Sequence, residues 1–438
     1  MEAEKFFVAI DLGSTKITGA LARKTPEGKI DILACETVDA KSIIDCGEIR
    51  NTGETASKIK DIINKLNANK ILQENELEIT TVYVALGGHS ITSGTRTNVR
   101  LLGKGDEVSK KMIEEMYAEN YNLEIENAEI FGVFKQEYLV DDKLEYNPVG
   151  MNCFNLQGRY VIVYGKPILK FNLDSLQKVG DLKLVNEQLA PIASSLAALT
   201  DEDIEKGCVF IDFGAETTSV CVYFRGYLRQ LFVVPYGGSS VTEDIVKELN
   251  MLQADAEKMK IKFGNAMPET EEDRTIIIPS NRENENVPEI STLFVSQVIE
   301  ARIKEILDLI WKEITEAGLS RYLGAGFVIA GAASKLKNLD KLIELQTGCS
   351  AYYADFHKRL ELSENNKFSN FDNAVVLGLL MLTNESCVVK KEKPIVSEPE
   401  EKKENVFMKF AKRMKKKVDN VGSLFDEVDE NINTFQEK

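Results

Sequence analysis

One structural unit occurs twice in this sequence of 438 residues, and this duplication constrains the fold most strongly. Residues 6–39 predict an apolar strand that ends in Asp-x-Gly, then a second strand, a tight turn and a returning third strand. Residues 208–238 have the same order of strands and turns. Each unit precedes a segment with the 3.6-residue period of an amphipathic helix, at 53–67 and 239–250. The repeat therefore predicts two similar α/β domains that face one another.

The two Asp-x-Gly turns are typical of a phosphate site. A tight turn lets successive backbone N–H groups point at an anion, and glycine allows close approach of the backbone. Asp11 and Asp212 are then expected to face each other across a cleft, where they would hold Mg²⁺ through its water molecules. Further hydroxyl and ammonium donors follow the two aspartates, namely Ser14, Thr15, Lys16, Thr217 and Thr218.

A third glycine turn, Gly331-Ala332-Ala333-Ser334, lies between a predicted strand and a predicted helix within residues 326–348. It fits a turn placed against adenosine or the α-phosphate. Any one of these turns, taken alone, also occurs as an ordinary connection between secondary-structure elements. The duplication is what favours a two-lobed phosphate clamp.

The composition favours a globular protein of a reducing cytosol. With 43% hydrophobic and 28% charged residues, the chain is typical of soluble domains. Its start lacks the apolar run of a signal peptide, and its longest apolar stretch, 374–382, is far shorter than the ~20 residues that span a bilayer. The seven cysteines include no CxxC motif, which predicts free thiols. The formal net charge of −16 argues against nucleic acid as the main partner.

The last part of the chain differs from this acidic body. Residues 387–405 contain two prolines, many charges and few apolar residues, which predicts a disordered tether. Residues 405–418 then contain six cations and no acid. At 100° per residue, an apolar side and a basic side separate in this segment, and the residues expected to contact lipid are Phe407, Phe410, Lys412, Met414, Lys416 and Val418.

Three interpretations of this amphipathic segment compete. A basic interfacial helix on anionic lipid explains why attraction is concentrated on one tethered segment of an acidic protein. The apolar spacing also fits a heptad and hence a partner helix. A helix docked on the core, or a merely solvated basic tail, is the third possibility.

Taken together, the three turns resemble those of the actin-like ATPase superfamily, and other stretches resemble the FtsA family of bacterial cell-division proteins. These stretches are "CGEIRN" (46–51), "VYVALGG" (82–88), "QEYLVDD…NPVGM" (136–151), "PYGGSSVTEDI" (235–245) and "VIEARIKEILDLI" (298–310). The resemblance covers residues 6–384, and the basic terminal segment extends it. It implies an α/β, duplicated ribonuclease-H-like fold of two lobes with an inserted α+β subdomain, which in the family contacts the neighbouring subunit of a protofilament.

The resemblance also implies a domain order. It comprises subdomain 1A at 1–87 and 166–200, inserted subdomain 1C at 88–165, subdomain 2A at 201–240 and 308–384, subdomain 2B at 241–307, a flexible linker at 385–405, a membrane-targeting amphipathic helix at 406–428 and an acidic tail at 429–438.

The family's ATP site carries over to this sequence at four places. The implied residues are Asp11, Gly13, Ser14, Thr15 and Lys16 in the first phosphate turn; Asp212, Gly214, Ala215, Glu216 and Thr217 in the second; Gly238, Glu257 and Lys260 near the lobe junction and adenosine; and Gly331, Ala332, Ala333 and Ser334 in the adenosine turn.

Two departures from the family pattern bear on the chemistry. Many relatives have Gly-Gly-Gly-Thr at the second phosphate turn, where this chain has Gly214-Ala215-Glu216-Thr217. Glu216 either brings negative charge to the turn or points outward. In related ATPases a Gln or Glu on the connecting helix positions the attacking water, and here Ala190 takes that place. Hydrolysis is therefore expected to be slow unless Glu187 or Gln188 substitutes.

The resemblance implies an ATP- and Mg²⁺-binding protein that polymerises and anchors FtsZ to the cytoplasmic face of the bacterial cell membrane at the division site. Its implied partners are the FtsZ C-terminal tail, further copies of itself, anionic lipid and later division proteins. The FtsZ site is expected on subdomain 2B, where Arg302 and Lys304 would meet an acidic peptide. Two alternatives remain, a PilM-like pilus-assembly scaffold and a small-molecule kinase of the same fold, although no convincing acidic base for a kinase is found.

Overall fold

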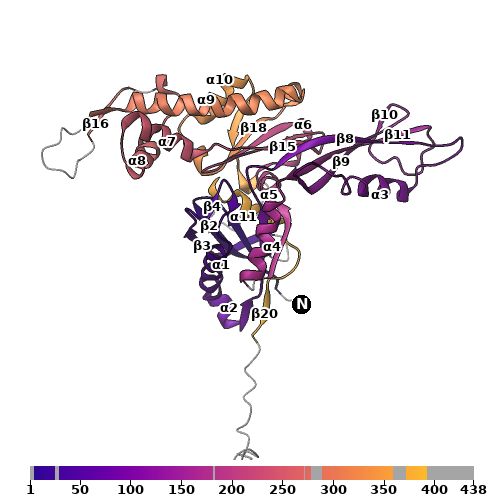
Figure 1. Cartoon of the computed structure of the whole chain (residues 1–438), viewed down its shortest axis with the longest axis horizontal. Helices are drawn as coiled ribbons and strands as arrows, with labels where there is room; N and C mark the ends of the chain where they lie inside the picture. Colours follow the sequence, from indigo (N-terminus) through magenta and orange to yellow (C-terminus); the bar gives the residue numbers. More distant parts are fainter. Residues whose placement is uncertain are drawn as a thin grey trace, which may run out of the picture. The chain divides into compact units, whose positions relative to one another are not determined.

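The computed structural model describes residues 4–24, 29–180, 183–270, 272–277, 289–358 and 371–391 (Figure 1). The body of the protein is one compact unit that ends at Lys390. The expected linker beyond residue 391, the amphipathic segment 406–428 and the acidic tail 429–438 lie outside the described residues. None of the described helices is both long and apolar enough to cross a membrane.

The first lobe is built on a mixed sheet with the strand order β12-β7-β1-β2-β3. Its strands are β1 (Phe6–Leu12), β2 (Lys16–Lys24), β3 (Ile30–Asp39), β7 (Thr81–Leu86) and β12 (Lys183–Leu189). Strand β1 is buried between two neighbours, which explains why it reads as the continuous apolar run Phe6–Ile10. Its helices are α1 (Thr52–Asn67), α2 (Lys70–Glu74), α4 (Ile168–Gly180) and α5 (Ala190–Ala198).

The second lobe repeats this arrangement in the sheet order β15-β14-β13-β18-β19. Its elements are β13 (Cys208–Phe213), β14 (Thr218–Phe224), β15 (Tyr227–Val234), β18 (Gly326–Ala330), β19 (Ala351–Tyr353), α6 (Asp201–Lys206), α7 (Gly238–Leu249), α8 (Gln253–Phe263), β16 (Thr275–Ile277), β17 (Glu289–Ser291), α9 (Thr292–Glu316) and α10 (Leu339–Thr347). Ile299, Ile303 and Ile306 place one face of α9 in the core of this lobe.

The predicted duplication is confirmed down to the strand register. Asp11 pairs with Thr18 across the first hairpin, and Asp212 pairs with Ser219 across the second. Each aspartate therefore faces the residue seven positions later, and the two Asp-x-Gly turns have the same length. The local pattern of apolar strands and glycine turns was sufficient to predict both units.

The inserted subdomain consists of strands from β8 (Thr92–Leu101) to β11 and one helix. Its other elements are α3 (Lys110–Ala118), β9 (Glu129–Val140), β10 (Lys143–Glu145) and β11 (Asn155–Gly165). Strand β8 was not predicted, because its small and polar residues lack a clear period. It pairs with β15 at Thr92 and Phe232, so the insertion, although it follows a first-lobe strand in sequence, extends the second-lobe sheet (Figure 1).

A buried ion pair reinforces this junction. The guanidinium of Arg229 in β15 binds the carboxylate of Glu137 in β9, with Nη1 and Oε2 at 2.7 Å. Burial opposes ionisation of Glu137, but hydrogen bonds and charge from Arg229 outweigh it and keep the pKa of Glu137 below its usual value. The amide of Gln136 also donates to the Leu228 carbonyl at 2.8 Å.

The end of the described chain corrects two expected boundaries. Helix α11 (Ala374–Leu382), assigned from sequence to subdomain 2A at 308–384, packs against α5 and the first-lobe strands. Strand β20 (Val388–Lys390) pairs with β6 (Leu77–Ile79), although these residues were assigned to the flexible linker at 385–405. Cys387 is fully buried, and its N–H donates to the Phe6 carbonyl at 2.7 Å. The tether therefore starts no earlier than residue 391.

Helices α5 and α11 approach so closely that a glycine is required between them. A Cβ atom on Gly378 would lie 1.8 Å from the Ala193 carbonyl oxygen, which is rigid helix backbone. Gly53, near the start of α1, is a contrasting case, since a Cβ there would meet only the Asn51 side chain at 3.7 Å.

We expect Gly378→Ala to lower the free energy of unfolding by about 1–3 kcal/mol, because the added methyl must push two buried helices apart. Gly53→Ala is the matched control and should be neutral or stabilising, since alanine favours the helix. Urea denaturation followed by circular dichroism measures both. Equal stability of the two variants would show that α5 and α11 can move apart to admit the methyl group without loss of stability.

Candidate functional site

The two predicted phosphate turns have the same local geometry. Gly13 and Gly214 each lie directly over the carbonyl oxygen three residues later, so that a Cβ would come 2.8 Å from Lys16 O and 2.7 Å from Thr217 O. Gly214 N–H also donates to Thr217 O at 2.9 Å, which closes the second turn. Glycine is therefore needed in both turns for a steric reason, independent of any ligand.

The two aspartates of these turns influence each other electrostatically. Burial raises the pKa of Asp11 to about 6, and the nearby charge of Lys16 opposes this rise. Burial, together with the negative charge of Asp11, raises the pKa of Asp212 to about 7, although a hydrogen bond with Ser194 opposes it. Two half-buried like charges near each other are costly, and a divalent cation bound between them would offset that cost.

The third turn packs against the second. Gly331 has φ of +94°, and a Cβ on it would lie 2.5 Å from the Asp212 carboxylate and 2.3 Å from Phe213 O. Ser334 is fully buried, and its hydroxyl donates to the Gly331 carbonyl at 2.7 Å. Ala332 begins the short 3₁₀ helix Ala332–Lys335 that follows. The predicted adenosine turn therefore lies against the second phosphate turn.

Asp372 also belongs to this site, and sequence reasoning missed it. Its carboxylate lies 3.7 Å from Lys16 Nζ in the first turn and 2.7 Å from Lys335 Nζ beside the third turn. Its negative charge also contributes to the raised pKa of Asp212. The only signal in the sequence was an acid just before the apolar run of α11, a pattern that usually means a helix start.

The start of α7 connects the second turn to the predicted adenosine-side residues. Gly237 serves as the helix N-cap, and the N–H groups of Gly238 and Ser239 donate to the carbonyls of Gly214 and Ala215 at 3.0 and 2.6 Å. A Cβ on Gly238 would lie 3.0 Å from Ala333 Cβ, so the lobe junction and the third turn are in contact.

Glu257 and Lys260 lie three residues apart on α8, and Lys260 reaches this junction, where the resemblance places both residues. The Lys260 ammonium is buried, lies 2.8 Å from the Glu257 carboxylate, and donates to Gly238 O at 2.8 Å. It also donates at 2.8 Å to the hydroxyl of Thr242, a residue that sequence reasoning did not single out. The ammonium is thus fully engaged by protein groups, while the Glu257 side chain stays partly exposed.

Glu216 does not point outward. Its carboxylate reaches the first lobe, where Oε2 accepts a hydrogen bond from the Cys46 N–H at 2.6 Å. Ser14, in the first turn, accepts from the next amide, Gly47 N–H, at 3.0 Å. Thr15 contributes its backbone carbonyl, which accepts from Ala40 N–H at 3.0 Å.

Ala190, the residue at the expected water-positioning place, is the first residue of α5. Gln188 lies half-buried in β12, and the side chain of Glu187 lies outside the described residues. The methyl group of Ala190 cannot orient a water molecule by hydrogen bonding.

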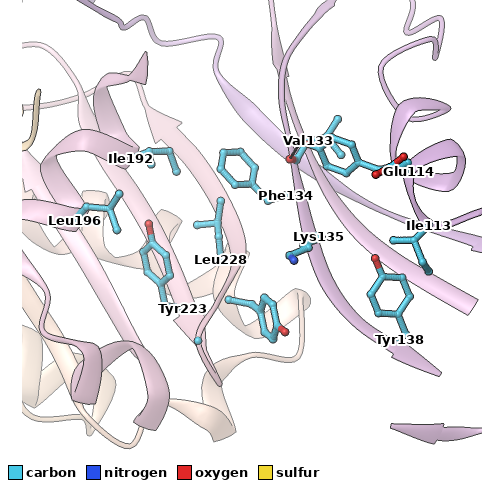
Figure 2. Close-up of a pocket in the computed structure, with 13 residues that line it drawn as sticks. Ile113, Glu114, Val133, Phe134, Lys135, Tyr138, Ile192, Leu196, Tyr223 and Leu228 are labelled. Carbon is cyan, nitrogen blue, oxygen red and sulfur yellow. Dashed lines mark hydrogen bonds between the residues drawn. The ribbon is translucent and has the colours of Figure 1, made fainter. Parts of the chain in front are cut away.

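A cavity of about 700 Å³ lies away from the three turns, between the inserted subdomain, α5 and the β14–β15 hairpin. Figure 2 shows Ile192, Leu196 and Tyr223 on one side of it and Val133 and Tyr138 on the other. Its lining includes no residue of the glycine turns, so the nucleotide argument rests on the turns themselves and not on this cavity.

The expected FtsZ-contacting residues lie on α9 and are both paired. The guanidinium of Arg302 is only 20% exposed and binds the Asp244 carboxylate of α7, with Nη2 and Oδ1 at 3.0 Å. It also binds Glu305 and lies over the Tyr236 ring. Lys304 is 46% exposed, and its ammonium lies 2.9 Å from Glu300. Arg302 therefore joins α9 to α7, whereas Lys304 is accessible.

Comparison with known proteins agrees with this architecture. A family model for "Cell division protein FtsA" matches residues 209–378, and a model for "SHS2 domain inserted in FTSA" matches residues 87–164. Cell division protein FtsA of Porphyromonas gingivalis is 28% identical over 335 residues, which is 76% of this chain and 69% of that protein. The FtsA protein of Escherichia coli K12 is 25% identical over 346 residues, covering 76% and 80%.

Among solved structures, the PilM–PilN type IV pilus biogenesis complex matches with a TM-score of 0.59 and 15% identity, over 85% of this chain and 97% of that one. This likeness concerns the fold alone, whereas the two family models and the curated relatives concern the sequence. The chain has the actin-like fold with an SHS2 insertion, and it belongs to the FtsA family of cell-division proteins.

Proposed function

We propose that this protein binds ATP with Mg²⁺ between its two lobes, polymerises, and anchors FtsZ to the cytoplasmic face of the cell membrane at the division site. The observation that carries the nucleotide part is the pair of like turns, in which the negative charge of Asp11 helps to raise the pKa of Asp212. The family membership supports the cell-division part.

The residues of the cleft fit a magnesium nucleotide. Mg²⁺ keeps several of its waters and is bound by one or two carboxylates together with the substrate phosphates, and it neutralises phosphate charge. Asp11 and Asp212 supply such carboxylates. Their pKa values are raised to about 6 and 7, and a bound cation would stabilise the ionised form of both. Lys16 is the ammonium of the first turn and already neutralises an acid of the site, Asp372.

The remaining cleft residues orient the nucleotide rather than activate water. The hydroxyl of Ser14 accepts from Gly47 and keeps its own hydrogen for a phosphate oxygen. Lys260 holds the start of α7 by donating to the Gly238 carbonyl. Glu257, which pairs with Lys260, is the residue that we assign to adenosine. With Ala190 at the start of α5, turnover is slow, and ATP acts mainly as a ligand that favours the closed, assembling form.

The alternatives are less well supported. A small-molecule kinase needs an acidic base beside a hydroxyl substrate. Among the described acids of the site, Asp11 and Asp212 are assigned to the metal, Asp372 is paired with lysines, and Glu216 is engaged by the Cys46 N–H. A PilM-like scaffold shares the fold, but a likeness at 15% identity does not carry function. Both family models instead name FtsA.

Membrane attachment is assigned to residues 406–428 from their sequence pattern. Each cation near an anionic surface contributes about 1 kcal/mol, and partial burial of Phe407, Phe410 and Met414 adds an apolar contribution. One such segment gives a reversible hold. A polymer presents many of them together, so avidity raises membrane occupancy without any change in the segment.

We expect the double reversal Lys412→Glu and Lys416→Glu to release the protein from anionic liposomes, because it removes the attraction of the segment. The matched control reverses Lys402 and Lys403, which changes charge equally but lies in the linker. Co-sedimentation with liposomes measures both, and high salt should mimic the first. Equal retention of the two variants would favour a partner helix over a lipid surface.

FtsZ binding is assigned to the α9 surface, and the structure changes which residue tests it. Arg302→Glu would set a new negative charge against Asp244 and loosen α7 from α9, so weakened binding would have two causes. Lys304 holds only a solvent-exposed pair with Glu300 and is the better probe.

We expect Lys304→Glu to weaken binding of an FtsZ C-terminal peptide about tenfold, because a cation at the rim of an interface is replaced by an acid. Lys312→Glu is the control, since Lys312 is exposed on the same helix and also pairs one turn away, with Glu316. Fluorescence anisotropy with a labelled peptide gives both affinities. If the two variants bind alike, Lys304 is not part of the FtsZ surface.

A further inference from the structure

The second phosphate turn reaches the first lobe through a single carboxylate. Glu216 Oε2 accepts from the N–H of Cys46 at 2.6 Å. Cys46 lies in the turn between β4 (Ile44–Asp45) and β5 (Glu48–Ile49). The next N–H of that turn, on Gly47, donates to Ser14 in the first phosphate turn at 3.0 Å. Two successive amides of one turn are therefore bound by the two phosphate turns, one by each.

The N–H groups of Cys46 and Gly47 are two successive donors that can bind an anion. Cys46 and Gly47 both have positive φ, 48° and 75°, as in tight turns that expose successive N–H groups on one side. The Cys46 carbonyl is held by the His89 N–H at 3.1 Å, which fixes the turn. A carboxylate forms a strong charge-assisted hydrogen bond with such a donor, and a phosphate oxygen is equally suited to it.

The negative charge of Glu216 has no compensating cation. Among the residues that the structure describes, no lysine or arginine forms an ion pair with it. The carboxylate of Asp45 and the thiol of Cys46 lie close by, with the ligand atoms of all three within 4.8 Å of one another, and Arg50 neutralises Asp45 at 2.8 Å. A second anion that approaches the Cys46 amide is therefore repelled by the uncompensated negative charge of Glu216.

We propose that Glu216 makes the cleft discriminate between nucleoside diphosphates and triphosphates. Without nucleotide or with a diphosphate, its carboxylate holds the Cys46 amide and joins the two lobes. A γ-phosphate competes with it for that amide and is repelled by its charge, so a bound triphosphate releases the contact. This inference rests on the proposed nucleotide site and adds to it the residue that reports the third phosphate.

The test compares the affinities for Mg-ATP and Mg-ADP in the full-length chain, measured by isothermal titration calorimetry. In Glu216→Gln the ratio of ATP to ADP affinity should rise about tenfold, because one uncompensated charge near the γ-phosphate is removed. Glu248→Gln is the matched control, since it makes the same charge change at an exposed place of α7, and its ratio should equal that of the wild type.

A second variant separates the effect of the Glu216 charge from that of its side-chain length. Glu216→Asp keeps the charge but shortens the side chain by one methylene, so hydrogen exchange of the Cys46 amide without nucleotide should increase, while the ATP-to-ADP ratio should rise less than in Glu216→Gln because the repulsion remains. Equal changes in ATP and ADP affinity in Glu216→Gln, or unchanged exchange in Glu216→Asp, would overturn the inference alone. If the wild type bound neither nucleotide, the proposed function would fail, and this inference with it.

Discussion

The electrostatic cost of placing Asp11 and Asp212 together is the constraint on which the rest of the structure depends. Each carboxylate stands near the end of a buried strand in its own hairpin, and the charge of Asp11 acts on Asp212. Their pKa values, raised to about 6 and 7, show that the folded protein disfavours both charges. When folding raises the pKa of a carboxyl group, the free energy of unfolding falls as pH rises from about 4 through the folded-state pKa. Near neutral pH these two carboxylates therefore lower the stability of the ligand-free protein. The proposed binding of a cation there would offset this loss of stability.

The surrounding elements hold the three glycine turns in place. Helix α7 begins on the second turn, the third turn packs on Asp212 at Gly331, and Asp372 links Lys16 to Lys335. Glu216 adds the one direct carboxylate contact from the second turn to the β4–β5 turn. The Lys16–Asp372–Lys335 and Glu216–Cys46 contacts join the two lobes, and the proposed nucleotide switch would act through them.

The sequence predicted what local patterns encode. Both hairpins, their turns and helices α1 and α7 follow from apolar period and glycine placement, whereas helices α5 and α8 and the pair Glu257 and Lys260 were expected from the family resemblance. Contacts between distant segments could not be predicted in this way. Strand β8 pairs with β15, although no local pattern in either segment indicates this pairing. Strand β20 pairs with β6, although the charges around β20 predicted a tether. For the same reason Asp372 and the reach of Glu216 to Cys46 were found only in the structure.

The most direct measurement is the free energy of unfolding of Asp212→Asn relative to the wild type at pH 8, without and with Mg-ATP. Without ligand, the variant should be more stable than the wild type by up to about 4 kcal/mol, because a buried charge beside Asp11 is removed. At pH 4 the folded-state Asp212 is protonated and the unfolded-state aspartate is about half protonated, so the advantage should shrink. With Mg-ATP the order should reverse, because only the wild type binds the metal nucleotide tightly. A variant that is less stable than the wild type without ligand, or that gains as much stability from Mg-ATP, would contradict the account.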